Sequence, residues 1–169
     1  MRELLPGAAR FAVLANPGET SAALLTKDAQ TAAQSLGVQL EVVTAATNRE
    51  IDLAIADVVQ RHAAGFLVIP SALFTDRRLQ LATAAKYHHL PAIYPGQEFA
   101  EVGGLMSYGS NLADQERQLG IYAGRILKGE KPADLPAMRA TKFEFVINLQ
   151  TASTFGLMIP LRCSPSRTE

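Results

Sequence analysis

A chain of 169 residues, 48% of them apolar and 19% charged, is long enough for one globular domain and is neither disordered nor fibrous in composition. Sixteen basic residues balance sixteen acidic ones, so the chain has no net charge to attract nucleic acid or an anionic membrane, and we expect no nucleic-acid partner. A single cysteine excludes an internal disulfide, and the three histidines lack partners at zinc-ligand spacing, so we expect no metal site.

The first ninety-six residues alternate strand patterns with helix patterns. Residues 11–15 predict a buried strand, and residues 21–36 predict a helix that Gly37 closes. Asn48 is expected to cap the next helix, which would carry His62 on its apolar stripe. Further strands are expected at 38–45, 65–70 and 90–95, with a third helix from Thr75–Asp76 to His88–His89. This order predicts an α/β fold, a three-layer Rossmann-like sandwich around a mainly parallel sheet.

The alternation changes after Pro95. Residues 105–108 resemble a short strand, 130–136 a linker, 142–149 a half-solvated strand and 150–160 a short helix. Between them, residues 112–127 predict an amphipathic helix. Its apolar side holds Leu112, Leu119, Tyr122, Ala123, Ile126 and Leu127.

Ligands of parallel α/β sheets bind outside the carboxyl ends of the strands, so the loops that follow the strands form the candidate binding site. The candidate ligand contacts are Asn16, Glu19, Thr20, Ser21, Ser71, Leu73, Tyr94 and Gly96. Tyr94 is expected to stack against a ring or an apolar group of the ligand. Thr20 and Ser21 stand at a helix start that suits a small carboxylate, although capping of their own helix is the favoured alternative.

An enzyme of doubly wound, hydrolase-like fold is one alternative, with Ser71 or Ser107 as the nucleophile. It would need a histidine and an acid at the strand ends, whereas His88–His89 is expected to complement a helix dipole. A response-regulator-like signalling domain needs an aspartate at a strand end, which these strands lack. The first loop also lacks the glycines of a nucleotide-binding fingerprint. We therefore predict no catalytic residues and no cofactor.

Three segments carry a more specific pattern: "LPAIYPGQEFAEVGGLMSYGSN", "YAGRILKGEKPADLP" and "TKFEFVINLQTASTFGLMIP". With the earlier "ELLPGAARFAVLANPGE", they resemble the substrate-binding proteins of a bacterial ABC-transporter family, which includes receptors for tryptophan and other aromatic amino acids. The resemblance implies the solute-binding component of an importer, with an amino acid or related carboxylate as ligand and an ABC permease as partner. It implies a periplasmic or lipid-anchored location, although the sequence as given shows no secretory signal and would stay cytoplasmic.

Members of that family are two-lobed receptors of the type I periplasmic-binding fold, and the resemblance implies that this chain represents roughly the second lobe. It would form a single domain, 1–169, with core βα repeats at 8–96 and a hinge-crossing segment and helix at 97–140. A returning strand and helix would occupy 141–160, and an atypical tail 161–169, so Cys163 is given no function. The loop at Ser71–Leu73 is more apolar than in the family, which suggests a ligand without an amino group and leaves Glu19 as the nearest acid.

The resemblance also has a consequence for assembly. In family members a first lobe covers the segment equivalent to the 112–127 helix, and we expect that lobe to be missing here. An exposed apolar stripe is costly in water, and exchange of an element between identical chains covers it. We therefore expect a homodimer in which residues 103–140 reach across to the partner.

Overall fold

The computed structural model describes residues 4–136 and 142–159, so the predicted tail at 161–169, with Cys163, lies outside the described residues. The strands are β1 (Arg10–Ala15), β2 (Gln39–Thr44), β3 (Phe66–Val68), β4 (Ala92–Tyr94), β5 (Met106–Ser110) and β6 (Phe143–Ile147). The helices are α1 (Ala22–Ser35), α2 (Asn48–Gln60), α3 (Ala72–Asp76), α4 (Arg78–Tyr87), α5 (Gln97–Glu101), α6 (Leu112–Leu127) and α7 (Leu149–Thr154), with a short 3-10 turn at Pro132–Asp134.

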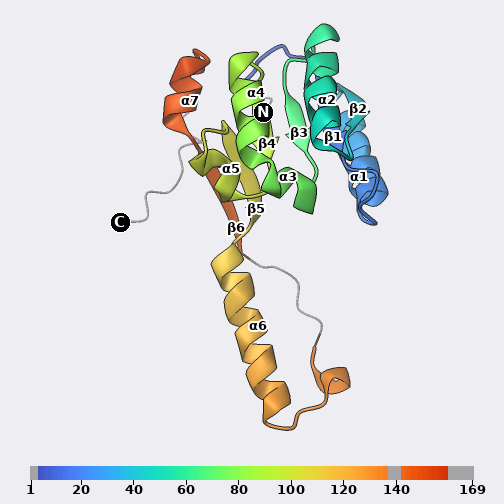
Figure 1. Cartoon of the computed structure of the whole chain (residues 1–169), viewed down its shortest axis with the longest axis vertical. Coiled ribbons are helices and arrows are strands. Elements are labelled where there is room, and N and C mark those ends of the chain that lie inside the picture. The colour runs from blue at the N-terminus through green and yellow to red at the C-terminus, as the bar shows by residue number, and fades with distance from the viewer. Residues whose placement is uncertain (1–3, 137–141, 160–169) are drawn as a thin grey trace.

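The strands form one sheet in the order β2-β1-β3-β4-β5-β6 (Figure 1). Strands β1 to β5 run parallel, and β6 pairs antiparallel with β5. The predicted α/β class with a mainly parallel sheet is confirmed. Because the parallel strands share one direction, their carboxyl ends lie along a single edge, which we call the carboxyl edge.

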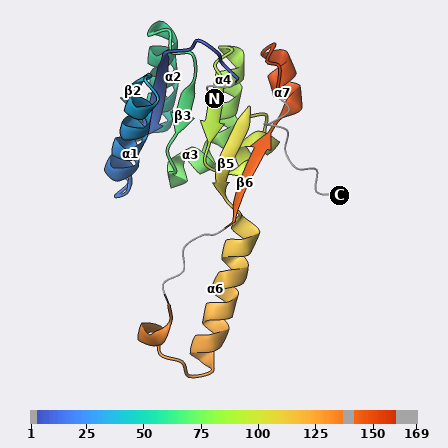
Figure 2. The same ribbon diagram turned by 180° about the vertical axis from the view of Figure 1, so that it is seen from behind.

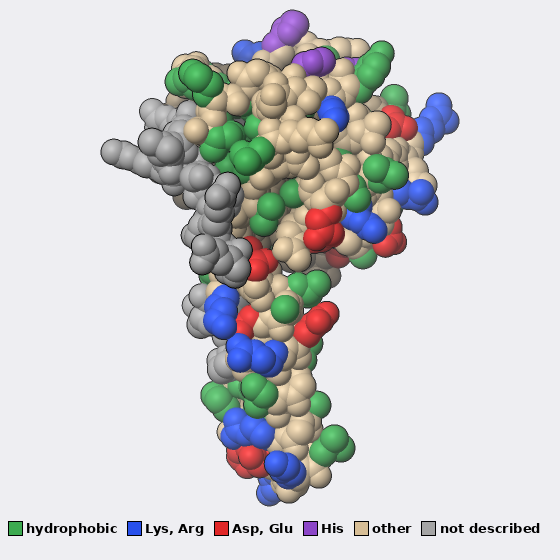
Figure 3. Space-filling model, turned by 90° about the vertical axis from the view of Figure 1, so that its left-hand side faces the viewer, with side chains coloured by type: hydrophobic (Ala, Val, Ile, Leu, Met, Phe, Trp, Pro, Cys, Tyr) green, Lys and Arg blue, Asp and Glu red, His purple; other side chains and the backbone are tan. Residues whose placement is uncertain are grey.

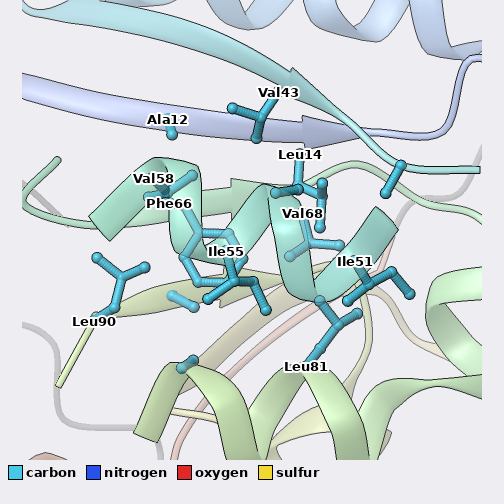
Figure 4. Close-up of a cluster of buried hydrophobic side chains, with 14 of the residues drawn as sticks. Ala12, Leu14, Val43, Ile51, Ile55, Val58, Phe66, Val68, Leu81 and Leu90 are labelled. Atoms are coloured by element: carbon cyan, nitrogen blue, oxygen red, sulfur yellow. The ribbon is translucent and has the colours of Figure 1, made fainter. Parts of the chain in front are cut away.

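Helices cover both faces of the sheet, which explains why β1 is apolar almost throughout. Ala12 and Leu14 point toward α2 and α4, into the largest core cluster, which Figure 4 shows. Val13 lies between them in sequence and packs on the opposite face, against Ala22 of α1. We call the two sides the α2 face and the α1 face. On the α1 face a third cluster joins α7 to β5 and β6 and includes Leu4, near the start of the described chain.

Several predicted boundaries require correction. Thr47, not Asn48, caps α2, because its hydroxyl accepts a hydrogen bond from the Glu50 amide. Helix α2 ends at Gln60, so His62 is not on its apolar stripe and instead adopts a left-handed conformation (φ 54°) in the turn that follows. The single helix predicted from Thr75–Asp76 is two helices, α3 and α4, and α5 was not predicted.

Strand β5 runs two residues further than predicted, to Ser110, and a glycine makes this extension possible. A Cβ atom on Gly109 would lie 1.8 Å from the carbonyl oxygen of Pro95. Only a residue without a side chain fits there. The loop after β4 therefore packs directly on the backbone of β5.

Helix α6 projects from the carboxyl edge as a stalk, away from the sheet (Figures 1 and 3). None of its residues is buried. Leu119 is 70% exposed and Leu127 is 87% exposed, so the predicted exposure of its apolar side is confirmed. Tyr122 is half-buried, and its hydroxyl donates a hydrogen bond of 2.5 Å to the Pro136 carbonyl oxygen.

Candidate functional site

Three of the predicted contacts meet at the carboxyl edge, where the loops after the adjacent strands β1 and β3 touch. Ser71 is buried, and its hydroxyl donates to Glu19 Oε1 at 2.9 Å and accepts from Asn16 Nδ2 at 3.1 Å. The same Glu19 oxygen accepts from the backbone amide of Ala72 at 3.1 Å. This network, which we call the edge cluster (Asn16, Glu19, Ser71), fixes two loops that are more than fifty residues apart in the chain.

Thr20 and Ser21 follow the edge cluster in the same loop, and both are exposed. The favoured alternative was that Thr20 or Ser21 caps its own helix. Ser21 does occupy the N-cap position of α1, but its side chain makes no capping hydrogen bond. The amides of the first turn of a helix have no partners within the helix itself. In α1 the Ala22 amide donates to the Glu19 carbonyl oxygen at 3.0 Å, whereas the next two amides, of Ala23 and Leu24, have no partner among the described residues. The two exposed hydroxyls and these two amides lie near the Glu19 carboxylate, an arrangement that suits a small ligand with both donor and acceptor groups.

Leu73 and Tyr94 were expected to contact a ligand at the carboxyl edge, but both side chains pack into the core instead. Leu73 is half-buried and packs against the core cluster of the α2 face. Tyr94 ends β4 at the predicted edge, but its side chain is completely buried, so the expected stacking on a ligand is wrong for this residue. Its ring stacks instead on Phe99, at a centroid distance of 4.8 Å, and meets Phe66 edge-on at 6.2 Å.

The Tyr94 hydroxyl is the one buried side-chain oxygen or nitrogen of the described residues that has no hydrogen-bond partner. Burial raises the pKa of this phenol well above its usual value, because the charged phenolate would lie in apolar surroundings. Tyr94 is therefore a neutral core residue rather than a ligand contact.

Gly96 belongs to a small recess of about 20 Å³, between the end of β4 and the start of α6. Ser107, Ser110, Glu98 and Glu144 line it as well. The sequence analysis missed the last three residues. One signal for Ser110 was available, because a parallel strand after β4 must also end at the carboxyl edge, and Ser110 ends that strand.

A polar network fixes the point where the chain leaves the sheet for α6 and returns into β6. Asn111 caps α6 by accepting a hydrogen bond from the Asp114 amide, and its side-chain amide donates to Glu144. The Asp114 carboxylate accepts a hydrogen bond from Arg117 and lies 3.0 Å from Lys142 Nζ. These two cations, Arg117 first, lower the pKa of Asp114. We call these residues the hinge network.

The geometry does not support a hydrolase. Each histidine follows the end of a helix that leads back to the start of the next strand, at the edge opposite the carboxyl edge. The histidines visible in Figure 3 lie at the end of the molecule away from the stalk. Neither Ser71 nor Ser107 shares a hydrogen bond with a histidine among the described residues. In that same part of the chain, no group of three His, Cys, Asp or Glu side chains is placed to hold a metal ion.

Comparison with known proteins supplies the wider context. A family model described as ABC transporter substrate binding protein matches residues 1–168. No curated protein sequence matches the chain. None of the helices in residues 4–136 and 142–159 has the length and apolar character to cross a membrane.

Solved structures share the fold. A conserved domain protein from Vibrio cholerae (23% identity, TM-score 0.88) covers 96% of this chain, which spans 54% of that protein. An ABC domain from Streptococcus pneumonia, solved in complex with L-Trp, is 21% identical in sequence, with a TM-score of 0.88. The match covers 96% of this chain and 56% of that one. A third structure is the ligand-free, open form of a substrate binding protein with adhesive properties from Clostridium difficile, with 20% sequence identity and a TM-score of 0.71. The match covers 95% of this chain and 54% of that one. The chain thus spans about half the length of these structures.

Proposed function

The chain belongs to the family of ABC transporter substrate binding proteins, and we propose that its carboxyl edge forms one wall of a cleft that binds a small organic solute for an ABC-type importer. Its sheet and helices have the architecture of one lobe of a type I periplasmic-binding protein. Proteins of this family act outside the cytoplasm and are solute-binding rather than catalytic. For this chain, the permease partner, the extracytoplasmic location and the lack of catalysis are part of the proposal.

The observation that carries the proposal is the edge cluster. A carboxylate that already accepts two hydrogen bonds with one oxygen is fixed in place, so binding a ligand costs little further ordering of this side chain. The second oxygen of Glu19 has no partner among the described residues and is free to accept a hydrogen bond from a ligand amine or hydroxyl. A few residues further along, the hydroxyls of Thr20 and Ser21 and the amides of Ala23 and Leu24 offer donors to a ligand carboxylate.

This arrangement refines the expected ligand class. The apolar loop at Ser71–Leu73 suggests a ligand without an amino group, but Glu19 is hydrogen-bonded to that same loop. An acid therefore stands beside Ser71 although the loop itself contains none. We accordingly place an amino acid or a hydroxylated carboxylate ahead of a simple carboxylate as the solute.

Three related probes test the proposal by NMR titration of the full chain: L-tryptophan, indole-3-propionate, which lacks the amine, and tryptamine, which lacks the carboxylate. We expect L-tryptophan to shift amide signals of residues 16–24 and 71–73 most strongly, and Glu19→Gln to weaken the shifts caused by the two amines. An exposed Leu53→Gln variant on α2 serves as a matched control. If no probe, and no other amino acid, shifts signals at the carboxyl edge, the proposed binding wall is wrong.

A further inference from the structure

The small recess between the end of β4 and the start of α6 contains polar groups that the proposed contacts at Glu19 do not use. It lies at the carboxyl edge, where Figure 2 shows β5 and β6 meeting the start of α6. Ser107 pairs with Tyr94, whose ring belongs to the core of the α2 face, and Gly109 pairs with Glu144. Because alternate residues of a strand share a face, the side chains of Ser107 and Glu144 point to the same side, toward α5. We call this site the β4–α6 recess.

Ser107 is the buried polar residue of the β4–α6 recess. It is 2% exposed, and its hydroxyl has no hydrogen-bond partner among the described residues. The hydroxyl is not sealed off, because Tyr94 alone among the described residues has a fully enclosed side-chain oxygen or nitrogen without a partner. Its accessible part therefore faces the recess that Ser107 lines. Buried hydroxyls are normally hydrogen-bonded, so an unpaired one at the wall of a recess points to a ligand.

Two carboxylates from different elements reach the same recess. A Cβ atom on Gly96 would lie 2.2 Å from Glu98 Oε2, so the Glu98 carboxylate is folded back over the backbone of Gly96. It has no hydrogen bond or ion pair among the described residues. Glu144 accepts a hydrogen bond from the Asn111 side chain with Oε1 and keeps its other oxygen free. None of the described residues that line the recess is a lysine, arginine or histidine.

The volume of the β4–α6 recess limits the size of its occupant. About 20 Å³ holds one group of the size of a water molecule, so the body of an amino acid does not enter. One wall cannot move outward, because the Pro95 carbonyl oxygen packs directly on the backbone of Gly109. The occupant is therefore a single small group, and its surroundings are oxygen acceptors.

We propose that the β4–α6 recess binds one primary ammonium group, with Glu98, Glu144 and Ser107 as its three acceptors. An ammonium group has three N–H donors and no acceptor, which matches two carboxylate oxygens and one hydroxyl oxygen. A divalent metal ion fits less well, since calcium takes six to eight oxygen ligands and magnesium requires near-octahedral geometry. No group of three His, Cys, Asp or Glu side chains in the described part of the chain is placed to hold a metal ion.

The recess selects among amines when it is combined with the proposed function, on which this step rests. An α-amino group is attached to a branched carbon beside a carboxylate, which Glu98 and Glu144 repel. A terminal ammonium on a flexible four-carbon stem, as in lysine, is narrow and has no acid beside it. The edge cluster lies between β1 and β3 and the recess between β4 and β5, so about 10 Å, two strand spacings, separates them. We therefore assign the recess to the terminal ammonium of a lysine-like solute whose α-amino group is bound at Glu19.

NMR titration of the full chain with n-butylamine hydrochloride at pH 7 tests the recess by itself, because this probe has an ammonium group and an alkyl stem but no carboxylate. We expect saturable shifts of the amide signals of residues 96–98, 107–110 and 144. Sodium chloride and potassium chloride at the same ionic strength should not reproduce these shifts. If either salt produces them equally well, the recess takes an inorganic cation and the proposal is wrong.

Two substitutions test the acceptors. Glu98→Gln should raise the dissociation constant of butylammonium about tenfold or more, since it weakens a charge-assisted hydrogen bond. Glu101→Gln removes the same charge from an exposed position at the end of α5, outside the recess, and should change the constant about twofold or less. Equal affinity of the wild type and Glu98→Gln would overturn the proposal.

Ser107→Ala distinguishes a binding role from a structural one. It should weaken binding about threefold or more, yet leave the urea midpoint unchanged or higher, because the lost hydroxyl has no partner within the described protein. A variant that loses stability but binds butylammonium like the wild type would show that Ser107 is not an acceptor.

L-lysine and L-norleucine separate this inference from the proposed function, since norleucine has the same four-carbon side chain without the ammonium group. We expect L-lysine to bind the wild type more tightly, and Glu98→Gln to remove this advantage. If butylammonium occupies the recess but neither amino acid shifts signals of residues 16–24, the recess stands and the proposed solute is wrong. If both amino acids bind equally well and butylammonium does not bind, the proposed function stands and the ammonium site is wrong.

Discussion

Replacement of Ser71 by alanine removes the central hydroxyl of the edge cluster and is expected to destabilise the fold measurably. The hydroxyl makes a charge-assisted hydrogen bond to Glu19, worth about 1.5–3 kcal/mol, and a neutral one to Asn16, worth about 0.5–1.5 kcal/mol. Both partners are half-buried, so water replaces part of what is lost, and Glu19 keeps its bond to the Ala72 amide. We expect a net loss of about 1.5–3 kcal/mol.

Urea unfolding followed by circular dichroism measures this loss, as a lower midpoint with an unchanged slope. The thermal midpoint should fall by roughly 3–10 °C for a chain of this size. Ser153→Ala, at an exposed position of α7, is the matched control and should change stability by less than about 0.5 kcal/mol.

A double-mutant cycle with Glu19→Ala then isolates the pair, with an expected coupling energy of about 1 kcal/mol. A Ser71→Ala variant as stable as the wild type, with no coupling to Glu19, would show that the edge cluster does not hold the two loops together.

Three further outcomes are expected. Gly109→Ala should destabilise the protein by about 1–3 kcal/mol or displace the loop after β4, because the new Cβ atom would overlap the Pro95 carbonyl oxygen. Urea unfolding measures the loss of stability, and the amide NMR signals of that loop show whether it has moved. Tyr94→Phe should be neutral or slightly stabilising in the same assay, because it removes a buried hydroxyl without a partner, whereas Tyr94→Ala should cost about 3–5 kcal/mol. The pKa of Asp114 is depressed in the folded state, so its contribution to stability is present above pH about 4, the range of an unfolded Asp, and is lost as the pH falls through the lower folded value. Unfolding midpoints at pH 7 and pH 3 should therefore differ less in Asp114→Asn than in the wild type, and an equal difference would contradict this.

Local sequence patterns were sufficient to predict the strands that form unbroken apolar runs and the helices with clear helical periodicity. Strand β1 is an unbroken apolar run because both of its faces are covered, and α1 and α2 show clear helical periodicity. The division of the third predicted helix was not visible, since neither glycine nor proline marks the break at Arg77. Phe74, which is completely buried, fixes α3 against the core, and this tertiary contact has no local signature.

The candidate site shows the same limit. The sequence was enough to place Asn16, Ser71 and Tyr94 at the carboxyl edge, because each follows or ends a strand and parallel strands end at a common edge. The direction of each side chain was not, since one residue of register decides which face a strand residue occupies. Tyr94 points into the core for this reason. The bond between Ser71 and Glu19 joins residues 52 positions apart, and no pattern within either loop indicates it.

The excursion through α6 also affects the order in which the sheet can form. It separates the antiparallel partners β5 and β6 by the 32 residues from 111 to 142, whereas a hairpin with a loop of about four residues is common. Each doubling of a flexible loop adds about 0.6 kcal/mol of closure entropy, so three doublings make this pairing about 1.8 kcal/mol harder to close than a hairpin. Among the described strands, β6 lies at one end of the sheet and pairs with β5 alone. Its amides should therefore exchange with solvent through partial opening, well before those of β1, and β6 is the strand that the nascent sheet acquires last.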